Sequence, residues 1–270
     1  MRRRARVALG VALAVVSAGV CIIVGLGSLR GRGNRSSSPA VFVLGRSTTS
    51  LDPDQKSRNQ NVALAAASLN GAVVEPGGEF SFNGVVGERG EEQGYGPARV
   101  IVDGKSESGI AGGICQLSST MYNAALLAGM EITERRPHSR PVPYLPAGLD
   151  ATVSYGARDL RWVNTRAEAV TVRAAVDGPR VAVWIEGDSE GPEIRLFTQT
   201  VEVIPPRPMA PPDPTGRATT PSPPGARTIA QRGSAGYRVQ VWAERQSSDG
   251  GRTRELVSTD LYEPVNAVVK

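Results

Sequence analysis

Residues 7–29 form an uncharged apolar run, and this run constrains the topology of the whole chain. Its 23 residues, Val7 to Leu29, rise 1.5 Å each in a helix and so exceed the roughly 30 Å hydrocarbon core of a bilayer. Arginines at positions 2, 3, 4 and 6 precede the run, which favours a cytoplasmic N-terminus. We therefore expect a single-pass anchor in the cell membrane, with an extracytoplasmic ectodomain.

A cleaved signal peptide is the alternative interpretation of the same run. Its exit would be a small-x-small site such as Val16-Ser17-Ala18. The apolar region of a signal peptide is shorter than this one, so the length favours the anchor. Arg30, Arg32 and Arg35 follow the run and reduce the charge asymmetry that sets the orientation.

The net charge of +5 comes from the N-terminal segment. Seven arginines and no acidic residue lie within residues 1–35, which leaves 31 − 7 = 24 basic against 26 acidic residues in the remainder. A nucleic-acid binder needs a basic patch in its folded part, so the slightly acidic remainder excludes nucleic acid as a partner.

Composition shifts divide the chain into four parts. Residues 1–39 are expected to form a cytoplasmic stub, the anchor and a flexible tether rich in Arg, Gly, Asn and Ser. Residues 40–188 carry the main folded domain, and residues 189–232 an extended strand and a proline-rich linker. Residues 233–270 contain two alternating runs across Asp249-Gly250-Gly251, which predict a β-hairpin.

The periodicity of the main domain predicts two helices and several strands. Apolar residues at helical spacing place the helices at 59–70 and 114–128, each next to a glycine. Alternating runs between turn residues predict strands at 75–83, 100–102, 131–135, 151–155, 160–163, 169–175 and 180–186. The expected fold class is α+β: two helices on a mainly antiparallel sheet, with one N-terminal transmembrane helix and a C-terminal β-hairpin module.

One cysteine and one histidine are the strongest candidates for chemistry. If Cys21 lies in the bilayer, Cys115 is alone in an oxidising compartment and is a candidate reactive thiol. The expected start of a helix at Ile114 would lower the thiol pKa through the helix dipole. His138 is the sole histidine and the one candidate general base of ordinary pKa, with Asp150 or Asp159 following it as an orienting acid.

Purely structural roles are an equal alternative for Cys115 and His138. A cysteine at a helix end is often a small buried residue, and a single histidine is often a satisfied polar group. One histidine excludes a multi-histidine zinc site, and the Gly109–Gly113 segment lacks the Lys and Ser/Thr of a phosphate-binding loop. We expect no metal and no cofactor.

Several long motifs, in order, resemble the VanW-like family. They are Pro76-Gly77-Gly78-Glu79-Phe80-Ser81-Phe82-Asn83, Val86-Gly87-Glu88-Arg89, Gly94-Tyr95, Gly112-Gly113-Ile114-Cys115-Gln116-Leu117-Ser118-Ser119-Thr120-Met121-Tyr122-Asn123-Ala124-Ala125, Glu134-Arg135, His138-Ser139 and Gly148-Leu149-Asp150-Ala151-Thr152-Val153. Ala111 stands where the family usually has the first of three glycines, which stiffens that loop. Residues 233–269 also resemble part of a G5-type β module, through Gly236-Tyr237, Asp249-Gly250, Tyr262 and Pro264-Val265.

The resemblance implies a bacterial cell-envelope protein of a type named for a vancomycin-resistance gene cluster. Its partner would be cell-wall peptidoglycan or its precursors, with the membrane contacted through residues 7–29. Three functions stay open: binding or action at peptidoglycan, a cysteine-dependent amidase or transpeptidase-like enzyme, and a structural module without catalysis. In the enzyme, Cys115, His138 and Asp150 would be catalytic. The residues expected to bind substrate beside the thiol are Gln116, Ser118, Ser119 and Tyr122.

Overall fold

The computed structural model describes residues 41–102, 105–206, 229–231, 233–246, 250–266 and 268–269. The described part is an α+β fold in which every strand pair is antiparallel. This confirms the α+β class and the mainly antiparallel sheet that the periodicity predicted. The predicted anchor at 7–29 lies outside the described residues; of the helices within them, none has the length and apolar character needed to cross a membrane.

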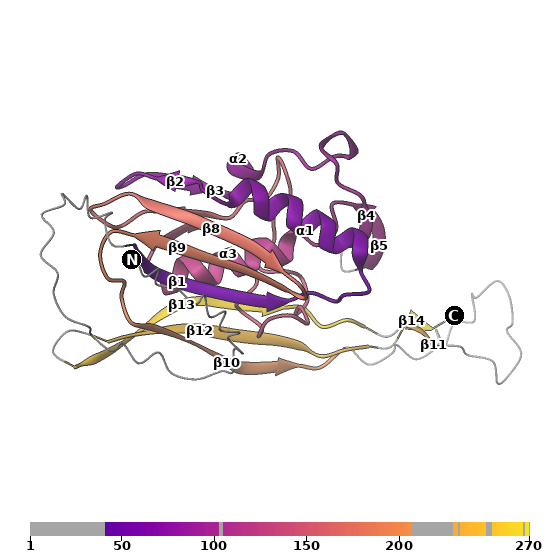
Figure 1. Ribbon diagram of the computed structural model, residues 1–270. Helices are drawn as coiled ribbons and strands as arrows, with labels where there is room; N and C mark the ends of the chain where they lie inside the picture. Colours follow the sequence, from indigo (N-terminus) through magenta and orange to yellow (C-terminus); the bar gives the residue numbers. More distant parts are fainter. Residues whose placement is uncertain are drawn as a thin grey trace, which may run out of the picture. The chain divides into compact units, whose positions relative to one another are not determined.

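A four-stranded sheet in the order β1-β9-β8-β2 carries the two long helices (Figure 1). Helix α3 contacts β1 and β9, and α1 contacts β8 and α3. Twelve residues of α3 are buried, and the five polar ones among them form hydrogen bonds within the protein. The elements of this layer are β1 (Phe42–Ser50), α1 (Lys56–Leu69), β2 (Val73–Val74), α3 (Ile114–Leu127), β8 (Val170–Asp177) and β9 (Arg180–Gly187).

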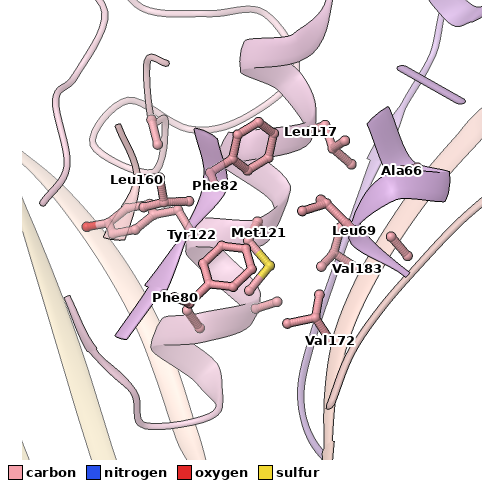
Figure 2. Packing of buried hydrophobic residues seen from close by; sticks show 14 of the residues in the cluster. Ala66, Leu69, Phe80, Phe82, Leu117, Met121, Tyr122, Leu160, Val172 and Val183 are labelled. Carbon is pink, nitrogen blue, oxygen red and sulfur yellow. The ribbon is translucent and has the colours of Figure 1, made fainter. Parts of the chain in front are cut away.

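A smaller sheet in the order β3-β7-β6 closes the other side of the core. Phe80 of β3 lies opposite Trp162 of β7 in register, and their rings stack with centroids 4.8 Å apart. Figure 2 shows Phe80 and Phe82 gathered with Met121 and Tyr122 of α3. The remaining elements here are β3 (Glu79–Ser81), α2 (Phe82–Val86), a 3-10 turn (Glu91–Gln93), the hairpin β4 (Pro97–Val102) and β5 (Lys105–Ile110), β6 (Glu131–Glu134) and β7 (Arg161–Val163).

The C-terminal strands form a three-stranded sheet in the order β10-β12-β13. Val239, Val241 and Tyr262 of this sheet are buried, and Tyr262 contacts the loop between β6 and β7. Residues 39–270 group as one compact unit, so the boundaries predicted at 188 and 233 stay predictions. These strands are β10 (Ile194–Ile204), β12 (Gly236–Gln246) and β13 (Arg252–Tyr262), beside a short pair of β11 (Ile229–Gln231) and β14 (Val268–Val269).

Helices α1 and α3 and most predicted strands lie where the periodicity put them. The strand predicted at 151–155 is wrong: these residues form a loop with one isolated bridge between Ser154 and Arg158. The physical reason is that side chains of α3 replace a partner strand. The backbone N–H of Ala151 donates to Ser119 Oγ, and the Ala151 carbonyl accepts from Ser118 Oγ at 2.7 Å.

Candidate functional site

Cys115 is the second residue of α3, at the end of that helix where backbone N–H groups point outward. The chain enters α3 through Gly113, whose φ of 108° is a left-handed conformation that favours glycine. Cys115 is partly buried, and its sulfur lies 3.5 Å from the Val153 carbonyl oxygen. The expected combination of a lone thiol with a helix start is therefore present.

His138 and Asp150 both lie in the long loop between β6 and β7 and contact each other directly. Asp150 Oδ2 is 2.6 Å from ring Nδ1 of His138 and accepts the backbone N–H of His138 at 2.6 Å. Since Nδ1 is occupied by Asp150, Nε2 is the ring nitrogen left for the thiol. The thiol of Cys115 lies close enough to the ring of His138 for each group to shift the pKa of the other. The structure thus brings Cys115, His138 and Asp150 together.

Asp150 is completely buried and sits among several donors. Tyr262 donates its hydroxyl to Oδ1, and Arg135 Nη2 lies 3.5 Å from the same oxygen. Arg135 also donates from Nε to the Asp150 carbonyl at 2.7 Å and forms a buried ion pair with Asp260. An ionised carboxylate in this position is stable only because these partners compensate its lost hydration.

The three groups shift each other's pKa values towards an ion pair. Burial alone would raise the pKa of Cys115, but the hydrogen bond and charge of His138, together with Arg89, lower it. Burial likewise opposes the charged ring, yet the hydrogen bonds to Asp150 and Cys115 raise the pKa of His138 to about 9. The pKa of Asp150 is lowered, because its hydrogen bonds from His138 and Tyr262 outweigh burial. Both shifts favour a thiolate beside an imidazolium over a neutral thiol beside a neutral ring.

Three residues near the thiol were not predicted as site residues. The charges of Arg58 and Arg89 interact with Cys115, and the pKa of Tyr144 is raised by burial and then by the charge of Cys115. Arg89 Nη1 is buried and finds no hydrogen-bond partner among the described residues. Arg58 lies in a helix and Arg89 in a glycine-rich turn, where arginines are usually surface charges. No local sequence pattern therefore identifies them as site residues.

The four residues predicted to bind substrate are buried and bonded within the protein. Gln116 accepts from Arg58 and donates to Thr49 and Ser50, which ties α3 to α1 and β1. Ser118 and Ser119 both bond the Cys115 and Ala151 carbonyls, so they hold the loop against the helix start. Tyr122 is 1% exposed and packs in the core beneath Arg135. Their contacts fix the position of Cys115 and Asp150.

Asp159, the other acid open to consideration, has a structural role. It accepts from Ser81 Oγ and from the Asn83 backbone N–H at the start of α2, and it contacts Arg161. Of the two acids, Asp150 is the one that contacts His138. In the part of the chain that is described, no group of three or more metal-ligating side chains gathers at any point.

The loop before Cys115 contains a backbone strain that a glycine would relieve. Ala111 has a φ of 60°, where its Cβ crowds the following carbonyl, and it stands at the position noted above for a glycine. We expect Ala111→Gly to raise the free energy of unfolding by about 1 kcal/mol in chemical denaturation. Ala65→Gly, in the regular part of α1, is the matched control and should lower stability by at least about 1 kcal/mol. A less stable Ala111→Gly protein would contradict the strain.

The fold and the site define an α+β domain with a cysteine, a histidine and a buried aspartate in contact at a helix start. Residues 57–185 match the family model described as VanW like protein. Over these residues, which are just under half of the chain, it is similar to the VanW-like family.

Two relatives are each similar over about half of the chain. The uncharacterized protein YoaR of Bacillus subtilis strain 168 is 45% identical over 131 residues, which are 48% of this chain and 43% of that protein. The vancomycin B-type resistance protein VanW of Enterococcus faecalis strain ATCC 700802 / V583 is 28% identical over 141 residues, 50% of this chain and 51% of that protein. The chain therefore spans about half the length of these relatives. No solved structure shows significant similarity to it.

Proposed function

We propose that this chain is a cell-envelope enzyme that cleaves or exchanges amide bonds through a thioester on Cys115. The observation that carries the proposal is the direct contact of His138 with the fully buried Asp150, with the Cys115 thiol near enough to the same ring to shift its pKa. A buried acid that holds the histidine ring, next to a thiol of lowered pKa, is the arrangement that cysteine acyl transfer needs.

The proposed chemistry runs in two steps that balance in protons. The Cys115 thiolate attacks the carbonyl carbon of an amide, and the negative charge that forms on its oxygen lies near the outward N–H groups at the start of α3. His138 gives the Nε2 proton to the leaving amine, and a thioester remains on Cys115. Water or a second amine then attacks the thioester, loses a proton to His138 and releases the thiolate.

Each supporting residue has a defined part in this scheme. Asp150 fixes the ring through Nδ1 and stabilises the imidazolium, while Ser118 and Ser119 hold the loop of Asp150 against the helix. Arg89 and Arg58 add positive charge beside the thiolate. We place Gln116 and Tyr122 with the supporting residues, because neither presents a free polar group in its buried surroundings.

The proposed setting is the bacterial envelope. A relative is named as a vancomycin resistance protein, and the apolar run at 7–29 would hold the folded part at the outer side of the membrane. We propose the peptides of peptidoglycan or of its precursors as the substrate, since these supply amide bonds at that surface. The partial G5-like tail supports wall binding as a second function, and Phe197, Leu256 and Leu261 of the C-terminal sheet are exposed.

The test uses the full-length chain with purified sacculi. Wild-type protein and Cys115→Ala are incubated with sacculi. The wall is then digested, and the masses of its separated fragments are measured by mass spectrometry. Wild-type protein should change the pattern of peptide bonds and, after acid quenching, carry an acyl group on Cys115; Cys115→Ala should do neither. Cys21→Ala is the matched control and should behave as wild type.

Two outcomes would contradict the enzyme. Unchanged turnover in Cys115→Ala would show that the thiol is not the nucleophile. If wild type, Cys115→Ala and Cys21→Ala all leave the wall unaltered but still sediment with sacculi, the enzyme proposal is wrong and wall binding is the function that remains.

A further inference from the structure

Strand β13 reaches the site from outside the region that matches the family. The matched residues end at 185, whereas Tyr262 is the last residue of β13. Tyr262 is fully buried, donates its hydroxyl to Asp150 Oδ1 and accepts the backbone N–H of Gly148 at 2.6 Å. One phenol therefore holds both the carboxylate of the orienting acid and the backbone two residues before it.

This hydroxyl fixes the rotation of the Asp150 carboxylate. Oδ2 is occupied by two hydrogen bonds from His138, and Oδ1 is occupied by Tyr262. Burial and the charge of Asp150 raise the pKa of Tyr262, so the phenol stays protonated and remains a donor. A carboxylate held at both oxygens cannot turn away from the histidine ring.

A second contact from β13 holds the nearest competing donor. Arg135 Nη2 lies 3.5 Å from Asp150 Oδ1, close enough to take that oxygen if the carboxylate turned. Asp260, two residues before Tyr262 on β13, forms an ion pair with Arg135 Nη1. Arg135 also donates to the Gly148 carbonyl at 2.9 Å, so β13 holds this loop through two side chains.

The close fit of the loop on the C-terminal sheet supports the same conclusion. Gly148 has a φ of 94°, and a Cβ at this position would come within 2.5 Å of Val241 Cγ2 on β12. The backbone of the loop thus rests directly on the sheet that carries Tyr262.

We propose that Tyr262 is a positioning residue for the Cys115–His138–Asp150 site, and that strand β13 completes a site which the family-matched residues alone leave unfinished. The proposal rests on the proposed function, because it assigns Tyr262 a role in the same acyl transfer. Its chemical content is that the phenol keeps Asp150 on His138 and away from Arg135. Activity then depends on strand β13 being seated.

The test exploits the single histidine of the chain, because its ring C–H signals in the NMR spectrum can come from no other histidine. In the full-length protein the His138 ring is expected to titrate at about 9. In Tyr262→Phe the carboxylate turns to Arg135, so the midpoint should move down towards the ordinary value for histidine. Turnover on sacculi should fall about tenfold, the effect of one hydrogen bond to a buried charge.

Tyr237→Phe on β12 is the matched control, since Tyr237 lies opposite Tyr262 in register. The substitution removes the same phenol hydroxyl group. Its His138 midpoint and turnover should equal those of wild type. Asp260→Asn is the second variant, for use if Tyr262→Phe does not fold. It frees Arg135 to bind Asp150, so the His138 midpoint should again move down.

An unchanged His138 midpoint in a folded Tyr262→Phe protein would overturn the positioning role, as would an unchanged midpoint in Asp260→Asn. The titration needs no substrate, so its failure is distinct from failure of the proposed function. A protein without turnover whose midpoint still moves in Tyr262→Phe supports the positioning of the ring while the enzyme proposal falls.

Discussion

Replacing His138 by glutamine is expected to lower turnover on sacculi by about 10²- to 10⁴-fold, the usual contribution of a positioned acid and base. Glutamine fills similar space but neither accepts the thiol proton nor returns a proton to the leaving amine. The pKa of Cys115 should rise as well, because the hydrogen bond and charge of His138 are what lower it against burial. Carboxamidomethylation of Cys115 at pH 7 should accordingly slow, with intact-protein mass spectrometry as the measurement.

The control for this variant removes a positive charge from the same loop without touching the thiol. Arg136 is exposed and lies two residues before His138. Arg136→Gln should therefore keep the wild-type turnover and alkylation rate. If His138→Gln works as fast as Arg136→Gln, no proton passes through the ring, and the acyl-transfer mechanism is wrong.

The pH dependence of the thiol follows from the same ion pair. An unperturbed histidine titrates near 6.5, whereas the ring in the site has a pKa of about 9. The ring is thus charged at neutral pH, and its charge favours the thiolate form of Cys115 as pH rises through 7 and 8. Reactivity towards alkylating agents should fall at acidic pH, where the thiolate takes up a proton.

Local periodicity predicted the helices well because their burial pattern is repeated many times. Helix α3 has apolar residues on most of its turns and a glycine at its start, and the structure begins it at Ile114 as expected. The loop at 151–155 alternates like a strand, yet the backbone groups of Ala151 bond the side chains of Ser118 and Ser119, and Thr152 N–H donates to the Arg136 carbonyl. An alternating pattern of apolar and polar residues predicts which side chains are buried. It does not predict which groups hydrogen-bond the backbone.

The candidate site could be predicted only as far as its residue types allowed. Cys115 and His138 were the sole choices of their kind outside the apolar run, whereas Asp150 and Asp159 were equivalent by order along the chain. Tyr262 lies 112 residues from Asp150, and no spacing rule links positions so distant. Contacts of this kind depend on how the C-terminal sheet packs on the loop.

The largest loss of stability is expected from Trp162→Ala. Trp162 is fully buried, lies on the central strand of the β3-β7-β6 sheet and stacks on Phe80 with the rings inclined by 16°. Removing a buried tryptophan leaves a cavity and ends the ring contact, so the free energy of unfolding should fall by about 3–5 kcal/mol. Urea denaturation of the purified chain, followed by circular dichroism, measures it.

Two comparisons separate the ring from its polar group. Trp162 Nε1 is buried without a hydrogen-bond partner among the described residues, so the native indole already bears a desolvation cost. Trp162→Phe removes that N–H and keeps an aromatic ring opposite Phe80, so its loss should be far smaller than that of Trp162→Ala. Trp184→Ala, on a partly exposed site of β9, should also cost less. Equal losses in Trp162→Ala and Trp184→Ala would mean that the stacked pair does not anchor the sheet from which the loop of His138 and Asp150 extends.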